Sequence, residues 1–151
     1  MIDYLAIKEK LYKACAFFVE EKYNTVTASI ESYKKALFSE TKSSAGDKHE
    51  TGRAMLQLEM EKAGQQLTGV IEMKKVLNKI TFENSTGFSC LGSLIFTNKL
   101  NYFLAISAGK IIIENKTYYA ISTNSPIGQQ LLGKKVGDSI SFNKAKILNI
   151  L

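Results

Sequence analysis

The chain has 151 residues, of which 45% are hydrophobic, so it is long enough for one large domain or two small ones and too apolar to be disordered. Its net charge of +6 comes almost wholly from lysine, which favours acidic partners but lacks the arginine-rich stripe of a DNA-binding protein. Cys15 and Cys90 stand alone without a CxxC pair, and no apolar run suits a signal peptide or a membrane span, so a cytoplasmic protein without membrane contact is predicted.

The first half of the chain has the apolar pattern of paired helices. Residues 1–80 contain no proline, and apolar residues recur in them with the seven-residue spacing of a coiled coil. The first seam combines two such series: Leu5, Tyr12, Val19, Val26 and Tyr33, with Ala16, Tyr23, Ile30 and Leu37. The second seam, interrupted only by Lys74, consists of Leu56, Met60, Ala63, Leu67, Val70 and Leu77. The same seams would also suit one edge of a homodimer or a simple bundle.

A polar, turn-forming stretch at residues 39–47 separates the two seams. Two long helices joined by a short turn should fold back as an antiparallel hairpin, predicted here over residues 1–84 with its tip at about residues 39–52. With the turn centred in residues 39–47, Val26 and Ile30 are predicted to lie level with Met60 and Leu56. At 1.5 Å per residue, a helix of about 35 residues reaches roughly 50 Å, which is typical of a probe or a lever.

From about Thr86 the apolar period changes to two, and β-branched and aromatic residues predominate. Strands are predicted at residues 93–97, 102–108, 110–114 and 117–121, and a final hairpin at residues 139–142 and 146–150. Between them, Ser125 suits a helix N-cap, Pro126 the first helical position and Gly133 the position just past the end. Residues 85–151 therefore predict a small antiparallel sheet with one short helix, and the whole chain an α+β protein.

Few residues offer chemistry. His49 is the only histidine, so metal sites of the usual Cys/His kind are excluded. Asp47 and Glu50 stand three apart at the start of the predicted second helix, so both carboxylates project from one face. One interpretation is an Asp version of the capping box. The other is a pair of hard oxygen ligands for Mg²⁺, delivered to a partner's site by a long arm. Both interpretations stay open at this point.

The stretch at residues 121–138, ISTNSPIGQQLLGKKVGD, resembles the C-terminal signature of the GreA/GreB family. That signature has Ser-Pro-Ile, Leu-x-Gly-Lys-Lys and Gly-Asp in this order and spacing. The resemblance implies a coiled-coil hairpin followed by an FKBP-like domain that binds RNA polymerase at its secondary channel, with nucleic acid contacted only through the polymerase. The implied partner-binding residues are Ser125, Pro126, Ile127, Leu132, Gly133, Lys134 and Lys135.

The resemblance also implies a role for the hairpin tip. In that family an Asp-x-x-Glu after a glycine helps to position the second catalytic Mg²⁺ and a water in the polymerase. Gly46, Asp47 and Glu50 fall on this motif. The chain would then have no cofactor of its own and would be no enzyme; it would stimulate the polymerase to cleave backtracked transcripts, with Mg²⁺ bound only in the complex.

Two alternatives accompany this hypothesis. Thr51-Gly52-Arg53 departs from the family, which usually has an Asn and further acidic and aromatic residues after the Glu. A channel binder that inhibits or modulates polymerase without stimulating cleavage is therefore the first alternative. A peptidyl-prolyl isomerase or chaperone, suggested by the FKBP-like half, is the second. It would need an open aromatic-lined pocket, whereas Phe96, Tyr102, Tyr118 and Phe142 are predicted to be core residues.

Overall fold

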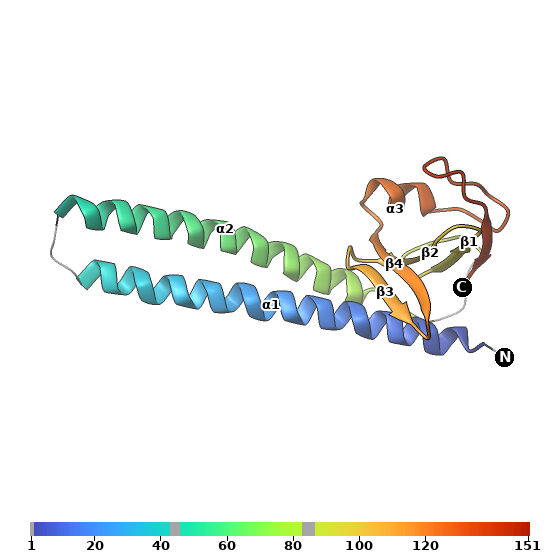
Figure 1. Cartoon of the computed structure of the whole chain (residues 1–151), viewed down its shortest axis with the longest axis horizontal. Helices are drawn as coiled ribbons and strands as arrows, with labels where there is room; N and C mark the ends of the chain where they lie inside the picture. The colour runs from blue at the N-terminus through green and yellow to red at the C-terminus, as the bar shows by residue number, and fades with distance from the viewer. Residues whose placement is uncertain (1, 43–45, 83–86) are drawn as a thin grey trace. The chain divides into compact units, whose positions relative to one another are not determined.

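The computed structural model describes residues 2–42, 46–82 and 87–151, and for the helical residues among 41–49 it describes the backbone alone. The elements follow in this order: α1 (Tyr4–Lys42), α2 (Gly46–Asn78), β1 (Leu94–Thr97), β2 (Asn101–Ala105), β3 (Gly109–Ile113), β4 (Lys116–Ser122), α3 (Pro126–Leu131) and β5 (Ile147–Ile150) (Figure 1). The predicted α+β architecture is confirmed, with a long helical pair followed by a sheet and one short helix. The chain divides into two compact units, Met1–Phe18 with Lys75–Leu151, and Val19–Lys74.

The unit Val19–Lys74 is the helical hairpin. Its buried hydrophobic residues, Val26, Ala63 and Val70 with Val19, all belong to the predicted seams. Lys74, which interrupts the second seam, places its ammonium 5.8 Å from the centre of the Tyr23 ring, a distance that suits a cation–π interaction. The charge at this apolar position is therefore stabilised by an aromatic ring of the facing helix.

The turn of the hairpin is shorter than predicted. α1 continues to Lys42, through residues that were predicted to be part of the turn. The carboxyl of Glu40 lies 3.6 Å from where a Cβ at Gly52 would stand, so the Glu40 side chain reaches the second helix. The level pairing of Val26 and Ile30 with Met60 and Leu56 stays a prediction.

The first turns of α1 belong to the other compact unit and bury a different face. Leu5, predicted in the seam, is 50% exposed, whereas Ile7, Leu11 and Cys15 are buried. Burial raises the pKa of the Cys15 thiol to about 12. The seam prediction failed here because these turns pack on the sheet in addition to α2.

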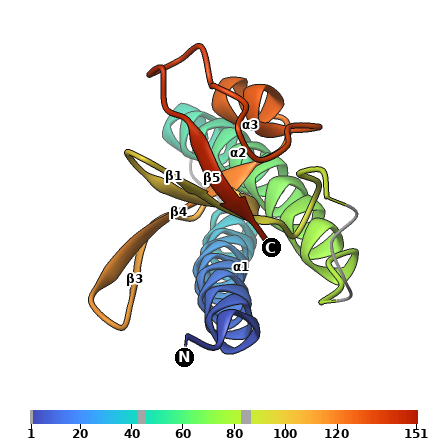
Figure 2. The same cartoon turned by 90° about the vertical axis from the view of Figure 1, so that its right-hand side faces the viewer.

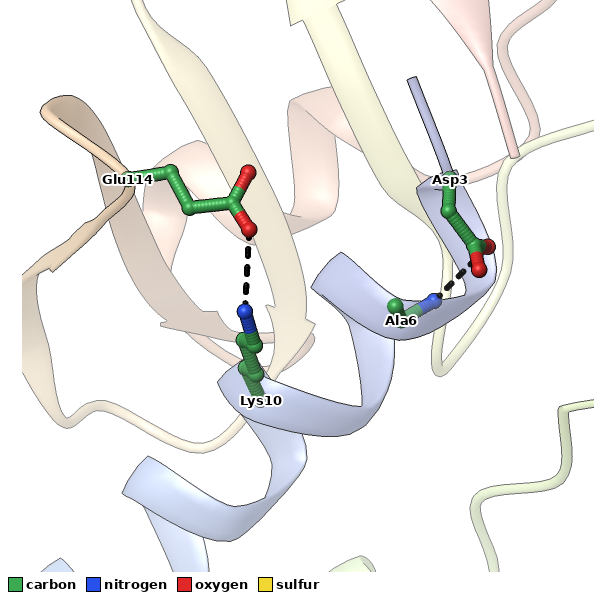
Figure 3. A network of polar contacts seen from close by, with 4 residues as sticks. All are labelled: Asp3, Ala6, Lys10 and Glu114. Carbon is green, nitrogen blue, oxygen red and sulfur yellow. Dashed lines mark hydrogen bonds and ion pairs between the residues drawn. The ribbon is translucent and has the colours of Figure 1, made fainter. Parts of the chain in front are cut away.

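Aromatic and polar contacts join the start of α1 to the sheet. The ring of Tyr4 lies edge-on to Phe96 of β1 at 5.5 Å, and Phe96 in turn lies 6.2 Å from Tyr118 of β4. Figure 3 shows Lys10 donating to Glu114 at 2.9 Å, and the amide of Ala6 donating to the Asp3 carboxylate, which caps the helix. The Lys10–Glu114 pair is solvent-exposed and contributes little stability by itself.

The sheet has the strand order β3-β4-β2-β1-β5. Three of its pairs are antiparallel, but β2 and β4 are parallel, so the prediction of an antiparallel sheet was wrong for that pair. The parallel pair arises because β4 returns between β2 and β3, an arrangement that apolar alternation does not reveal. The predicted strand at residues 139–142 is also reduced to one bridge, Ser139 with Lys146. There Gln130 of α3 accepts hydrogen bonds from Ser141 and Phe142, and a turn forms.

Both faces of the sheet are covered (Figures 1 and 2). On one face, Ile95, Tyr102 and Leu104 form a buried cluster with Leu131 of α3 and with Ile140, Ala145, Ile147 and Ile150. Residues of the opposite parity, Leu94, Phe103 and Tyr118, are fully buried on the other face, toward α1. The central strands are apolar on both sides for this reason. Within the described part of the chain, no helix combines the length and the hydrophobicity needed to cross a membrane.

Replacing Val26 by Asp should destabilise the hairpin, because Val26 is only 8% exposed and an unpaired carboxylate there loses its water. We expect the free energy of unfolding to fall by about 3 kcal/mol, measured by urea denaturation followed by circular dichroism. Met55 on α2 is 66% exposed, so Met55→Asp is the matched control and should stay within about 0.5 kcal/mol of wild type. Equal stability of the two variants would mean that the helices do not pair through Val26.

Candidate functional site

The two tip carboxylates lie on one helix. α2 begins at Gly46, so Asp47 and Glu50 are both helical, and their three-residue spacing makes them neighbours on one face. Asp47 stands inside the first turn and not at the cap position that the capping-box interpretation gave it. Its side chain lies outside the described residues, and Glu50 is exposed to solvent.

A third carboxylate, that of Glu40 on α1, lies beside Gly52 of α2. The absence of a side chain at Gly52 leaves space that the carboxyl of Glu40 occupies, 3.6 Å from where a Cβ would stand. Sequence analysis missed Glu40, because the pairing of the two helices decides which acid of α1 lies beside the start of α2. Among the side chains that the structure describes, no three His, Cys, Asp or Glu residues gather closely enough to hold a metal ion.

The predicted partner-binding residues begin at the N-terminus of α3, which Ser125 caps. As predicted, Ser125 is the N-cap: its hydroxyl accepts from the amide of Gly128 at 3.1 Å and donates to the carbonyl of Ser122 at 2.6 Å. Pro126 follows in the first turn. A Cβ at Gly128 would stand 1.9 Å from the Ser122 oxygen, so only glycine fits at this position.

A buried serine outside the signature anchors the loop after α3. Ser89 is 3% exposed. Its hydroxyl donates to the carbonyl of Leu131 and accepts from the amide of Lys134 at 2.8 Å. Its backbone adds two further hydrogen bonds, from the amide of Gly133 to the Ser89 carbonyl and from the Ser89 amide to the Lys134 carbonyl, each of 2.8 Å. Nothing in the local sequence marks Ser89, because its partners lie some forty residues later.

Residues 132–138, which we call the signature loop, are shaped by two glycines and one aspartate. Gly133 and Gly137 have φ angles of 70° and 95°, a region that favours glycine. The Asp138 carboxylate accepts from the amide of Lys135 at 2.9 Å, and the Asp138 carbonyl accepts from the amide of Ile147 at 2.8 Å. These bonds close the loop and fix it to β5.

The predicted partner-binding residues differ in their burial and in their structural role. Ser125 and Ile127 are structural, since Ser125 caps α3 and Ile127 packs against the buried cluster. Lys134 is half-buried. The exposed residues are Pro126, Leu132, Gly133 and Lys135. Val136, which the sequence analysis did not single out, is 56% exposed in the same loop.

The aromatic residues considered for an isomerase pocket differ in how deeply they are buried. Tyr102 and Tyr118 are buried, as predicted. Phe142, also predicted to be core, is 69% exposed, because the turn at residues 141–143 carries it out of the sheet. Burial raises the pKa of both tyrosines. The two buried rings contribute to packing and do not line an open surface.

Comparison with known families gives a match in the C-terminal part of the chain. Residues 106–150 match the family described as transcription elongation factor, GreA/GreB, C-terminal domain. The matched range spans β3, β4, α3, the signature loop and β5, and it contains all seven of the predicted partner-binding residues. A search of curated proteins found no match.

The geometry at Gly128 predicts a strong local effect of a single methyl group. Gly128→Ala should lower the free energy of unfolding by about 2–4 kcal/mol, because the added Cβ forces α3 away from the Ser122 carbonyl. Gln129, the next residue, is exposed, and Gln129→Ala should be nearly neutral. Thermal and urea unfolding of both variants measures the difference. Similar stabilities would mean that α3 does not start as described.

Proposed function

We propose that the protein binds RNA polymerase at its secondary channel and stimulates cleavage of backtracked transcripts, because residues 106–150 match the C-terminal domain of the GreA/GreB transcription elongation factors. The observation that carries this proposal is the combination of that domain with a preceding hairpin whose second helix begins Gly-Asp-x-x-Glu. The two parts have separate tasks: the C-terminal domain docks, and the hairpin delivers the tip carboxylates.

The helix lengths support a role as a probe. α1 has 39 residues and α2 has 33, so α2 alone is about 50 Å long. Hydrophobic residues at the hairpin interior hold the two helices together through Val26, Ala63 and Val70. A paired helix of this length can carry two side chains into a narrow channel, which a loop cannot do without a large loss of conformational entropy.

The signature loop supplies the docking surface in this proposal. Leu132 and Val136 present exposed apolar side chains, and Lys135 adds a positive charge beside them. Apolar residues next to a cation suit a partner surface that combines apolar and acidic groups. The loop is held by Ser89 and Asp138 before any partner binds, so little ordering entropy is lost on docking.

At the tip, Asp47 and Glu50 act as ligands and positioning groups inside the polymerase. Carboxylate oxygens are the hard donors that Mg²⁺ accepts, and Glu50 is exposed at the start of α2, so the donor set fits this ion. When bound in the complex, Mg²⁺ supplies the activation of a water for phosphodiester hydrolysis. The chain itself would hold the two carboxylates on one helical face, where they could accept hydrogen bonds from that water. The bond cleavage belongs to the polymerase, so the chain is no enzyme and has no cofactor of its own.

Docking through the signature loop predicts a local loss of affinity. Val136→Asp should weaken binding to cognate RNA polymerase about tenfold, because it places a charge in an apolar contact. Leu148 on β5 is 54% exposed, close to the 56% of Val136, so Leu148→Asp is the matched control and should bind as wild type does. Binding is measured by titrating labelled protein with core polymerase. Equal affinities of the two variants would move the docking surface away from this loop.

Amide substitution distinguishes a role of Asp47 and Glu50 in positioning Mg²⁺ from a purely structural role. Asp47→Asn and Glu50→Gln keep shape and hydrogen bonding but lose one negative charge each. If the carboxylates position Mg²⁺, transcript cleavage by a backtracked polymerase should slow tenfold or more, a barrier change above about 1.4 kcal/mol. Polymerase binding and melting temperature should stay near wild type, and higher Mg²⁺ concentrations should partly restore the rate.

The same measurement decides between the main proposal and its alternative. Full cleavage stimulation by both amide variants would mean that neither carboxylate charge is needed for cleavage. A wild-type protein that binds polymerase but does not stimulate cleavage would instead be a channel binder that modulates transcription. Thr51-Gly52-Arg53 replace the Asn and the acidic and aromatic residues that usually follow the Glu in the family, and this difference is the reason to test that outcome.

A further inference from the structure

Most of the net positive charge of the chain belongs to its C-terminal part. Residues 87–151 contain seven lysines against two acids, Glu114 and Asp138, which gives this part a charge of +5 out of +6 for the whole chain. Both acids already have partners, because Glu114 pairs with Lys10 and the Asp138 carboxylate accepts from the amide of Lys135. The lysines of this part therefore attract an anionic partner.

Three of these lysines lie together at one end of the sheet. β1 and β5 are antiparallel neighbours, so the turn after β1 adjoins the segment before β5. The amide of Asn98 donates to the carbonyl of Lys146 at 3.1 Å, and the amide of Lys146 donates to the Asn98 side chain at 2.9 Å. The ammonium of Lys99 donates to the carbonyl of Asn143. These bonds hold Lys99, Lys144 and Lys146, all exposed, on two adjoining turns.

An exposed aromatic ring lies in the same turn as two of these lysines. Phe142 is 69% exposed, more than any other large hydrophobic residue in the part of the chain that the structure describes. Its amide donates to the side chain of Gln130 at 2.9 Å, which fixes the backbone of the turn. Lys144 has a φ of 57°, in the region that favours glycine and asparagine. The backbone alone does not favour a lysine here, so its charge is the better explanation for its presence.

We propose that Lys99, Phe142, Lys144 and Lys146, which we call the basic aromatic patch, bind a single-stranded nucleic acid. The ammonium groups contact its phosphates, and one unpaired base stacks on the ring of Phe142. An acidic peptide would also satisfy the lysines but has no base for the ring. A duplex keeps its bases stacked on one another and away from the ring. The combination of charge and exposed ring therefore favours a single strand over both.

The basic aromatic patch is built to bind without reading the sequence or the sugar. Asn143, the amide side chain within it, is already engaged: its Oδ1 accepts from the amide of Ala145 at 3.0 Å, and its Nδ2 donates to the hydroxyl of Tyr102 at 3.4 Å. Residues 87–151 contain no arginine that could recognise the edge of a guanine. We therefore expect RNA and DNA single strands of equal length to bind with similar affinity.

Binding is tested by the fluorescence anisotropy of a labelled oligouridylate of about 12 nucleotides, titrated with the full chain. We expect a dissociation constant in the micromolar range at low salt. If about three phosphates are contacted, the affinity should fall roughly twentyfold between about 50 and about 200 mM salt. No binding at the lower salt concentration would overturn the proposal.

Two variants test the two components of the basic aromatic patch. Phe142→Ala should raise the dissociation constant about tenfold and leave the salt dependence unchanged, because it removes the stacking surface alone. Lys144→Gln should weaken binding and also lower the slope of log affinity against log salt by about 0.7, because it removes one phosphate contact. All the altered side chains are exposed, so melting curves should match that of the wild type.

Each variant has a matched control outside the basic aromatic patch. Phe88 is 54% exposed, and Phe88→Ala should bind as the wild type does. Lys116→Gln removes the same charge at the exposed start of β4 and should have little effect. Equal losses in Lys144→Gln and Lys116→Gln would mean that only net charge matters, and wild-type affinity in Phe142→Ala would mean that no base stacks there. Either result would overturn the proposal.

Competition identifies the class of partner. An unlabelled oligodeoxythymidylate of the same length should displace the probe about as well as unlabelled oligouridylate does, whereas a duplex and polyglutamate should be much weaker competitors. Polyglutamate that competes as well as the single strand would indicate an acidic protein partner instead, and an equally effective duplex would exclude base stacking. None of these measurements contains polymerase, so their failure would leave the proposed function untouched.

Discussion

The sheet depends on burial of both its faces: the first turns of α1 cover one face, and α3 covers the other. Phe103 and Tyr118 are fully buried on the face toward the first turns of α1, while Ile95 and Leu104 pack with Leu131 of α3 on the other. Without those turns of α1, large apolar side chains would face water, at a cost of about 1.5–3 kcal/mol for each. The C-terminal domain therefore requires the beginning of the chain. A fragment cut after the hairpin would lose one wall of its own core.

The signature that links residues 121–138 to a known family is mainly a description of loop geometry. Ser125 caps α3, Gly128 admits the Ser122 carbonyl, Gly133 and Gly137 provide positive φ angles, and Asp138 closes the loop. These residues form a recognisable motif because few other residue types fit the same backbone conformation. The side chains that remain exposed in the loop, Leu132, Lys135 and Val136, are unconstrained by the fold. The proposed partner surface thus consists of a small number of residues on a scaffold that the motif specifies.

Periodicity predicted the hairpin and the α+β class because both depend on local spacing. It failed wherever a distant segment decides what is buried. Leu5 has the seam spacing but is exposed, because the sheet draws Ile7 and Leu11 inward instead. The parallel pairing of β2 with β4 leaves no trace in the alternation of either strand. The sequence around Ser89 does not indicate its structural role, because that role consists of hydrogen bonds with the distant residues Leu131 and Lys134. The predicted partner-binding residues lie within one continuous motif, whereas Asp47 and Glu50 lie far from it in the sequence.

In the proposed role of the hairpin tip, the surrounding charges require the two carboxylates to act as a local pair. Between residues 40 and 53 the acids Glu40, Asp47 and Glu50 are balanced by Lys42, Lys48 and Arg53, so this segment has no net charge. The N-terminus of α2 adds a partial positive charge that disfavours a cation. Long-range attraction therefore cannot concentrate Mg²⁺ at the tip. In the proposed mechanism, Mg²⁺ would therefore have to be held by direct coordination to neighbouring carboxylates on one helical turn, which is sensitive to the loss of a single charge.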